Sequence, residues 1–267
     1  MSLVLLASGG LAFAGDTFLL EPRAAVRFES PLVVNFEGSR CAGVEARGSP
    51  DGGWTLCAHP ESPAWLADAG VIAATLDNNH AADGDPKATA TLLEAAGITT
   101  RLPWCRDGLC VVSWYDRRDD LERALKTVTR TARRGDVVVL VHQTRGSFEE
   151  RRRLLQRFAD AGARLVLASG THRVEPIERY RGAYLFHGLG DFAFDCACSD
   201  GTRGLVVEVR GRGALPTARL VKTSRRGAGT RLGERIVDEA ELVALAEASR
   251  QLDAPVAVVD GSLVLLP

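Results

Sequence analysis

The 267-residue sequence lacks the features that would place it in several broad functional classes. Its formal net charge is only -1, so it has no general positive field that would attract nucleic acid or acidic membranes. Its first fifteen residues are apolar, but they lack the positively charged start of a secretory signal and are too few to span a bilayer as a helix. We read them as core strand, and we expect a cytoplasmic protein with no nucleic-acid partner and no membrane anchor.

Cysteine patterns typical of zinc sites are also absent. None of the six cysteines belongs to a Cys-x-x-Cys pair, and their spacings match no common zinc-binding pattern. Because the sequence shows no export signal, we expect reduced thiols rather than disulfides or thiolate-bound metal.

What the chain does contain is an alternation of short apolar runs with stretches of helical spacing, which is typical of a layered α/β fold. Strands are predicted at 11–14, 31–36, 71–76, 109–114, 137–141, 164–168 and 183–186, and helices at 62–69, 86–96, 119–133 and 148–161. The tail predicts antiparallel strands at 205–209 and 217–221, a helix at 238–252 and strands at 256–259 and 263–266. We predict one domain over residues 1–267, with a core at 1–198 that residues 199–267 complete.

Polar side chains follow nearly every predicted strand of the core. In a parallel or mixed sheet the carboxyl ends of the strands line up along one edge, so these side chains are expected to converge there. A single Asp or His in such a place is more often a turn former or a satisfied polar group. Here, however, three of the five histidines occupy such ends. The residues concerned are Asp16, Asn35, Glu37, Asn79, His80, His142 and His172.

Such a cluster is costly to assemble without a cation, because neighbouring carboxylates repel each other and buried amides need partners. We therefore predict a site for one or two divalent metal ions. Oxygen and imidazole ligands are compatible with several metals. We favour manganese, zinc or iron over magnesium or calcium.

Five pieces of the sequence between Leu11 and Asp195 resemble the CapA family of capsule and poly-γ-glutamate synthesis proteins, which has the calcineurin-like metallophosphoesterase fold. The pieces are "FAGDTFL", "VVNFEG", "LDNNHAADGD" with the following "TLLEAAGI", "DVVVLVH", and "AGARLVLASGTHRVEPIE" leading to "YLFHGLGDFAFD". Their order, spacing and position after strands agree with the family pattern.

The resemblance implies a four-layer metallophosphoesterase-like sandwich of mixed sheets flanked by helices. It also implies that His80 donates or accepts a proton and that Asp83 orients it, although Asp83 could equally be a helix N-cap. Glu37 would bridge two metals. The implied metal ligands are Asp16, Glu37, Asn79, His142 and His172.

The sequence departs from the family pattern at two of these places. A run of the Gly-His-His-Pro-His kind is replaced by residues 168–172, "ASGTH", so only His172 remains and one metal position would lack a ligand. Asp191 stands where the family tends to have Asn.

The simplest chemistry for such a site is hydrolysis of a phosphoester or a peptide-like carbonyl by metal-activated water, with His80 as acid or base and a small molecule or peptide as substrate. Asn35 and Arg145 are our candidates for substrate binding. Arg151, Arg152 and Arg153 could also hold an anion, or they could be a solvated helix face. Two other functions stay open, a metal-assisted peptide Cα epimerase and a degenerate, non-catalytic subunit for surface-polymer synthesis. The oligomeric state is not predicted.

Overall fold

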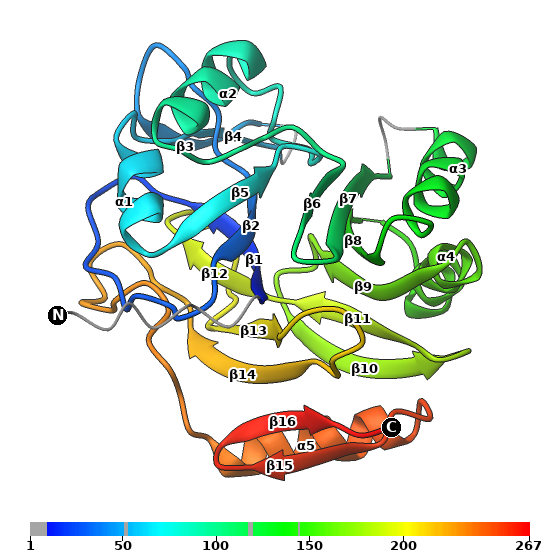
Figure 1. Cartoon of the computed structure of the whole chain (residues 1–267). Helices are drawn as coiled ribbons and strands as arrows, with labels where there is room; N and C mark the ends of the chain where they lie inside the picture. The colour runs from blue at the N-terminus through cyan, green and yellow to red at the C-terminus, as the bar shows by residue number, and fades with distance from the viewer. Residues whose placement is uncertain (1–9, 51–52, 117–119, 144) are drawn as a thin grey trace, which may run out of the picture.

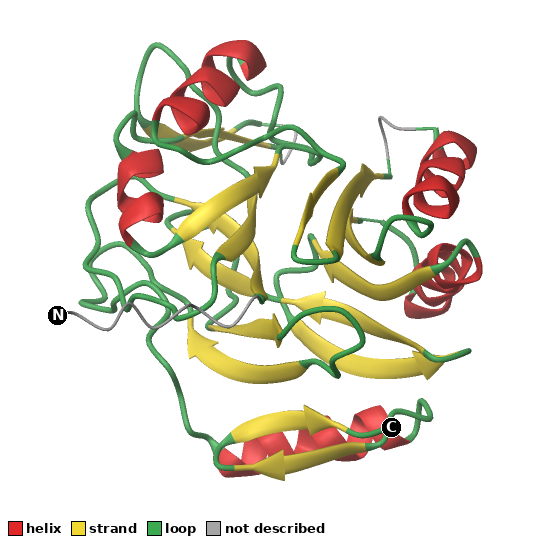
Figure 2. Cartoon of the chain, viewed as in Figure 1, coloured by secondary structure: helices red, strands yellow, loops and turns green. Residues whose placement is uncertain are grey.

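The computed structural model describes residues 10–50, 53–116, 120–143 and 145–267. The chain is an α/β protein with mixed β-sheets and, in this described part, five α-helices (Figure 2). The strands of the first large sheet are β1 (Leu11–Phe18), β2 (Leu32–Phe36), β5 (Val71–Thr75), β12 (Asp191–Phe194), β13 (Arg203–Val209), β14 (Thr217–Lys222), β15 (Val256–Val259) and β16 (Ser262–Leu265). Those of the second are β6 (Trp104–Arg106), β7 (Leu109–Tyr115), β8 (Asp136–His142), β9 (Ala163–Ser169), β10 (Val174–Tyr180) and β11 (Ala183–Leu189). β3 (Glu45–Gly48) and β4 (Trp54–Cys57) form a separate hairpin.

Both large sheets are mixed. The first has the order β15-β16-β14-β13-β1-β2-β5, with β12 also paired to β1, and its strands β12, β1, β2 and β5 are parallel. The second has the order β10-β11-β9-β8-β7-β6, in which the four central strands are parallel and the two edge strands antiparallel. The carboxyl ends of the parallel strands therefore share an edge in each sheet.

The two sheets pack face to face over one hydrophobic core. Phe13 and Val33 of the first sheet belong to the same buried cluster as Val138, Leu167 and Phe186 of the second. Separate apolar clusters cover the outer faces, where α1 (Ser62–Asp68) and α2 (Pro86–Ala95) lie beside β5 and where α3 (Leu121–Thr131) and α4 (Phe148–Asp160) pack on the second sheet (Figure 1). α5 (Glu239–Arg250) packs against β10 and the β15–β16 pair.

Every predicted strand and helix is present, with ends that differ by a few residues. Residues 1–9 of the expected first strand and residue 119 of a predicted helix lie outside the described residues. Helix ends follow their signals: Ser147 and Glu150 form a capping box at the start of α4, and Gly162 follows its end with φ +104°.

Five strands were not predicted, namely β3, β4, β6, β10 and β12. Their residues are not long apolar runs: β10, for example, reads VEPIERY and is only partly buried. Such strands form because a neighbour supplies the pairing, which a local pattern does not show.

The expectation of reduced cysteines is wrong for this structure, in which all six are paired. Cys105 and Cys110 face each other across the β6–β7 hairpin, and Cys41 reaches Cys57 because Ser39 pairs with the chain beside it. Cys196 and Cys198 are paired within one turn. Strand pairing, which the spacing of cysteines along the chain does not reveal, brings the first two pairs together.

Candidate metal centre

Two groups of ligand-type side chains meet at the carboxyl edge of the sheets. One consists of Asp16, Glu37 and His142, and the other of Asp16, His172 and Asp191. Within each group the ligand atoms lie within 4.8 Å of one another. Asp16 belongs to both groups, whereas Glu37, the bridging residue that the family resemblance implied, belongs to one.

Strand register explains why these side chains meet. In β1, Asp16 is the Cα partner of Asn35 in β2 on one side and of Asp191 in β12 on the other. The second sheet contributes the last residue of β8, His142, which is paired with Ser169 at the end of β9. The site therefore forms where strand ends from both sheets face each other.

Asn35 occupies the middle of the first group. Its Nδ2 lies 2.7 Å from Asp16 Oδ1, 3.0 Å from Glu37 Oε1 and 3.2 Å from His142 Nδ1. A primary amide has only two hydrogens, so it cannot donate to all three atoms at once. Asn35 is 5% exposed, and the structure thus places this predicted substrate-binding residue inside the ligand cluster.

The charges of this group fit a divalent cation. Burial, together with the nearby charge of Asp16, holds the pKa of Glu37 well above its usual range. Burial alone would raise the pKa of Asp16 too, but the nearby imidazoles of His172 and His142 and the hydrogen bonds from Asn35 and Gly170 outweigh it and lower that pKa. Glu37 Oε2 is buried and, within the described residues, has no hydrogen-bond partner. A cation would neutralise the two carboxylates and give this oxygen a partner.

The imidazole of His142 is held in one orientation. Its Nε2 lies 2.7 Å from Asn79 Oδ1, and an amide oxygen can only accept, so Nε2 carries the proton. Nδ1 is then the nitrogen with the lone pair, and it lies 3.4 Å from Glu37 Oε1. Gly170 packs against the ring, because a Cβ built there would lie 2.9 Å from His142 Cε1.

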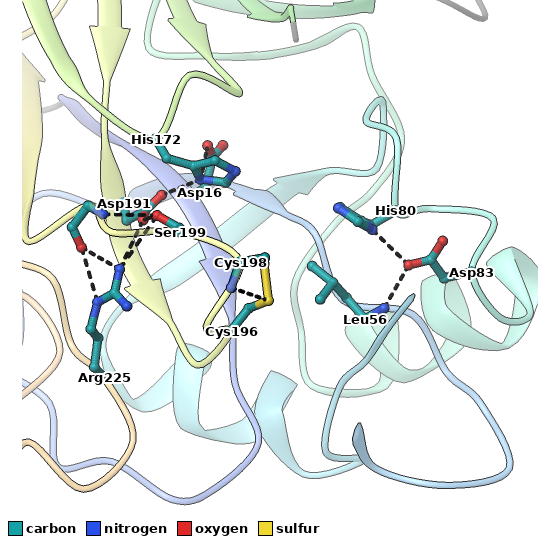
Figure 3. The surroundings of a disulfide bond; sticks show 11 residues. Asp16, Leu56, His80, Asp83, His172, Asp191, Cys196, Cys198, Ser199 and Arg225 are labelled. Atoms are coloured by element: carbon teal, nitrogen blue, oxygen red, sulfur yellow. Dashed lines mark hydrogen bonds and ion pairs between the residues drawn. A yellow bond between two sulfur atoms is a disulfide. The ribbon is translucent and has the colours of Figure 1, made fainter. Parts of the chain in front are cut away.

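In the second group, Asp191 and Asp16 bracket His172. His172 Nδ1 lies 2.7 Å from Asp191 Oδ1 and 3.4 Å from Asp16 Oδ2. Burial alone would lower the pKa of His172, but the hydrogen bond to Asp191 and the charge of Asp16 outweigh it and raise that pKa. Ser199 donates to the other oxygen of Asp191 at 2.7 Å (Figure 3).

Sequence reasoning noted Asp191 as a departure from the family pattern but did not count it as a ligand. In the structure Asp191 supplies a carboxylate beside His172. It therefore adds a ligand-type group at the place where residues 168–172 keep only one histidine of the family's run. Burial raises the pKa of Asp191. The signal was available, because Asp191 follows the buried run of β11 as the other candidates follow theirs.

His80 and Asp83 form a pair on the other side of the view in Figure 3. His80 Nδ1 lies 2.7 Å from Asp83 Oδ2, and the same oxygen accepts a hydrogen bond of 2.7 Å from the main-chain N–H of Leu56. The N-cap of α2 is Asp85, so Asp83 is not the cap, and its carboxylate is paired with His80 instead.

Asn78 joins this pair to the first ligand group. The main-chain N–H of His80 donates to Asn78 Oδ1, and Asn78 Nδ2 donates to Asn35 Oδ1, each at 3.0 Å. Asn78 was not predicted as a site residue, although it lies in the same polar segment as Asn79 and His80.

The predicted arginines lie apart from this cluster. Arg145 is exposed, and no hydrogen bond or ion pair joins its side chain to the described ligand residues. Arg151 pairs with Glu175 at 2.6 Å and Arg152 with Glu178 at 3.1 Å. Both of these arginines therefore hold α4 to β10 and are not free to clamp an anion.

In the described part of the chain, no helix is long and apolar enough to cross a membrane. Residues 103–196 match the family described as "Bacterial capsule synthesis protein PGA_cap". The chain is also 30% identical over 81 residues to the PGA biosynthesis protein CapA of Bacillus subtilis (strain 168). The matched segment covers 28% of this chain. The chain spans about a fifth, 21%, of the length of that curated relative. Residues 103–196 thus match the PGA_cap (CapA) family, and the chain is a distant homologue of CapA over part of its length.

Proposed function

We propose that the chain is a metal-dependent hydrolase with the four-layer arrangement of the metallophosphoesterases. Two sheets packed face to face, with helices on both outer faces, support that arrangement. The observation that carries the proposal is the pair of ligand groups that share Asp16, one of which contains Glu37, whose buried Oε2 has no hydrogen-bond partner among the described residues.

In such a reaction the residues of this chain would hold the metal ions and move a proton. Asp16, Glu37 and His142 would hold one metal, and Asp16, His172 and Asp191 a second. When bound, a divalent cation supplies Lewis acidity, which acidifies water and polarises a phosphoryl or carbonyl oxygen.

His80 would move the proton. Because a carboxylate accepts, Nδ1 carries the hydrogen of the bond to Asp83, and Nε2, which points away from Asp83 (Figure 3), is the nitrogen that would exchange a proton with the substrate. A well-placed acid or base of this kind contributes about 10²- to 10⁴-fold to the rate. The substrate would be a phosphoester or a peptide-like carbonyl in a small molecule or peptide.

The test is hydrolysis of a chromogenic phosphodiester by protein loaded with Mn²⁺ or Zn²⁺. We expect turnover that is lost in the Asp16→Asn variant and falls by about 10²-fold or more in His80→Gln. His59→Gln, at a histidine that stacks on Trp65 instead of entering the cluster, is the matched control. Equal turnover in wild type and His80→Gln would contradict the role of His80.

Epimerisation at a peptide Cα is a second candidate, because Asp83 and His80 form an acid–base pair that needs no leaving group. Deuterium uptake at a peptide Cα in deuterated water, without hydrolysis, would support it. If the protein shows neither hydrolysis nor deuterium uptake, the result would support a binding role in surface-polymer synthesis, since the CapA relative is a PGA biosynthesis protein.

A cytoplasmic location stays a prediction. The three disulfides weigh against it, because disulfides persist mainly in oxidising compartments.

A further inference from the structure

The β3–β4 hairpin touches the proposed acid–base pair. β3 and β4 form their own two-stranded sheet, outside both large sheets. From this hairpin the main-chain N–H of Leu56 donates to Asp83 Oδ2, the oxygen that also accepts the hydrogen bond from His80 Nδ1 (Figure 3). The position of the hairpin therefore decides whether Asp83 is held in place to orient His80.

A hairpin of two strands is marginally stable by itself, so other contacts must fix this one. The Cys41–Cys57 disulfide, which joins positions 16 residues apart, ties the residue after Leu56 to the segment that follows β2. In the same place the N–H of Ser39 donates to Leu56 O at 2.9 Å, and the N–H of Ala58 donates to Ser39 O at 3.0 Å.

The segment tied by this disulfide also holds the loop that carries His80. The single O–H of Ser39 lies within hydrogen-bonding distance of two carbonyls of this loop, those of His80 at 3.1 Å and Ala81 at 3.0 Å. Gly84 packs so closely that a Cβ built there would lie 2.8 Å from Cys41 Sγ. The disulfide thus lies between the two chain segments that position Asp83 and His80.

We infer that the Cys41–Cys57 disulfide and the main chain of Leu56 are a positioning element for His80, and that reduction of the disulfide releases it. This inference rests on the proposed function, because His80 matters as an acid or base there. Oxidised, the element holds Asp83 against His80 and keeps the proton on Nδ1. Reduced, it lets the hairpin move, Asp83 loses the N–H of Leu56, and the proton of His80 is no longer confined to Nδ1.

The reductant would be a dithiol. One of its thiolates attacks the sulfur of Cys41, the less buried of the two residues, to form a mixed disulfide and release Cys57 as a thiolate that takes up a proton. The second thiol of the reductant then displaces Cys41. Both cysteines end as thiols, and the dithiol is oxidised to its own disulfide, with two electrons and two protons transferred in all.

The test reads the tautomer of His80 and needs no enzymatic activity. Long-range ¹H–¹⁵N spectra of the full chain, with His80 assigned by a His80→Gln variant, show which ring nitrogen carries the proton. We expect Nδ1–H in the oxidised protein. After reduction with dithiothreitol, or in the double variant Cys41→Ser/Cys57→Ser, we expect loss of that signature and exchange of the Leu56 amide hydrogen at least about tenfold faster.

The double variant Cys105→Ser/Cys110→Ser removes a disulfide from the β6–β7 hairpin and is the matched control. It should leave His80 unchanged, and unchanged signals from the buried His187 would show that each protein is folded. Reoxidation should restore the Nδ1–H signature. An unchanged signature and unchanged exchange at Leu56, with a thiol assay showing Cys41 and Cys57 reduced, would overturn the inference. A failed hydrolysis assay would leave this result intact, so the two failures are distinguishable.

Discussion

Replacing Glu178 with Gln should destabilise the protein at neutral pH much more than at acid pH. Glu178, in β10, is 2% exposed and accepts from Gln156 at 2.7 Å, His187 at 3.0 Å and Arg152 at 3.1 Å. Two of these partners lie on α4 and one on β11, so this carboxylate joins the helix to the edge of the second sheet.

The magnitude follows from its pKa. Burial alone would raise the pKa of Glu178, but the hydrogen bonds from His187, Arg152 and Gln156 outweigh it and lower the pKa from 4.5 to about 2. The difference between a pKa of 4.5 and one of about 2 corresponds to about 3.4 kcal/mol, which we reduce to about 2 to 3 kcal/mol because Arg152 is partly exposed to screening solvent. A lowered carboxylate pKa stabilises the fold above pH 4.5, and this contribution is lost as the pH falls through about 2.

Urea denaturation at pH 7 and pH 3 checks this prediction. The difference in unfolding free energy between wild type and Glu178→Gln should shrink by about half or more at pH 3. The control is Glu149→Gln, at an exposed residue of α4. Its unfolding free energy should differ only slightly from that of the wild type at either pH. An equal difference at both pH values for Glu178→Gln would refute the assigned pKa and the reasoning built on it.

Three further variants test the fold and the site. Gly170→Ala should cost about 1 to 2 kcal/mol of unfolding free energy, measured by urea denaturation, because Gly170 has φ +94° and its new Cβ would meet His142; equal stability would contradict that contact. Phe186→Ala, fully buried between the sheets, should cost about 3 to 5 kcal/mol in the same assay, and a loss below about 1 kcal/mol would argue against that core. Ser199→Ala removes the donor to Asp191 and should weaken metal binding by about ten- to a hundredfold in a calorimetric titration, whereas unchanged affinity would mean that Asp191 is not a ligand.

Much of the fold could be predicted from local patterns. β1, β8 and β9 are buried along nearly their whole length, so they read as continuous apolar runs. β10 could not be predicted this way, because its pairing with β11 and its ion pairs to α4 come from the tertiary fold. Local patterns could not reveal the disulfides for the same reason. Cys41 meets Cys57 only because Ser39 pairs with the chain at Cys57 in the folded protein.

The site residues show the same division. Asp16, Glu37, His142 and His172 could be found because each follows an apolar run, and the rule that strand ends share an edge brings them together. That Asp16 would belong to both groups depends on the register of β1 between β2 and β12, which no local signal contains. Asn35 was found for the same reason, but its place among the ligands also depends on that register.

The most direct test of the metal centre is the divalent metal content of the purified protein, measured by inductively coupled plasma mass spectrometry. We predict one or two ions per chain in the wild type, a clear loss in His142→Ala and in His172→Ala, and the largest loss in Asp16→Asn. Metal content that is the same in all three variants as in the wild type would contradict the account.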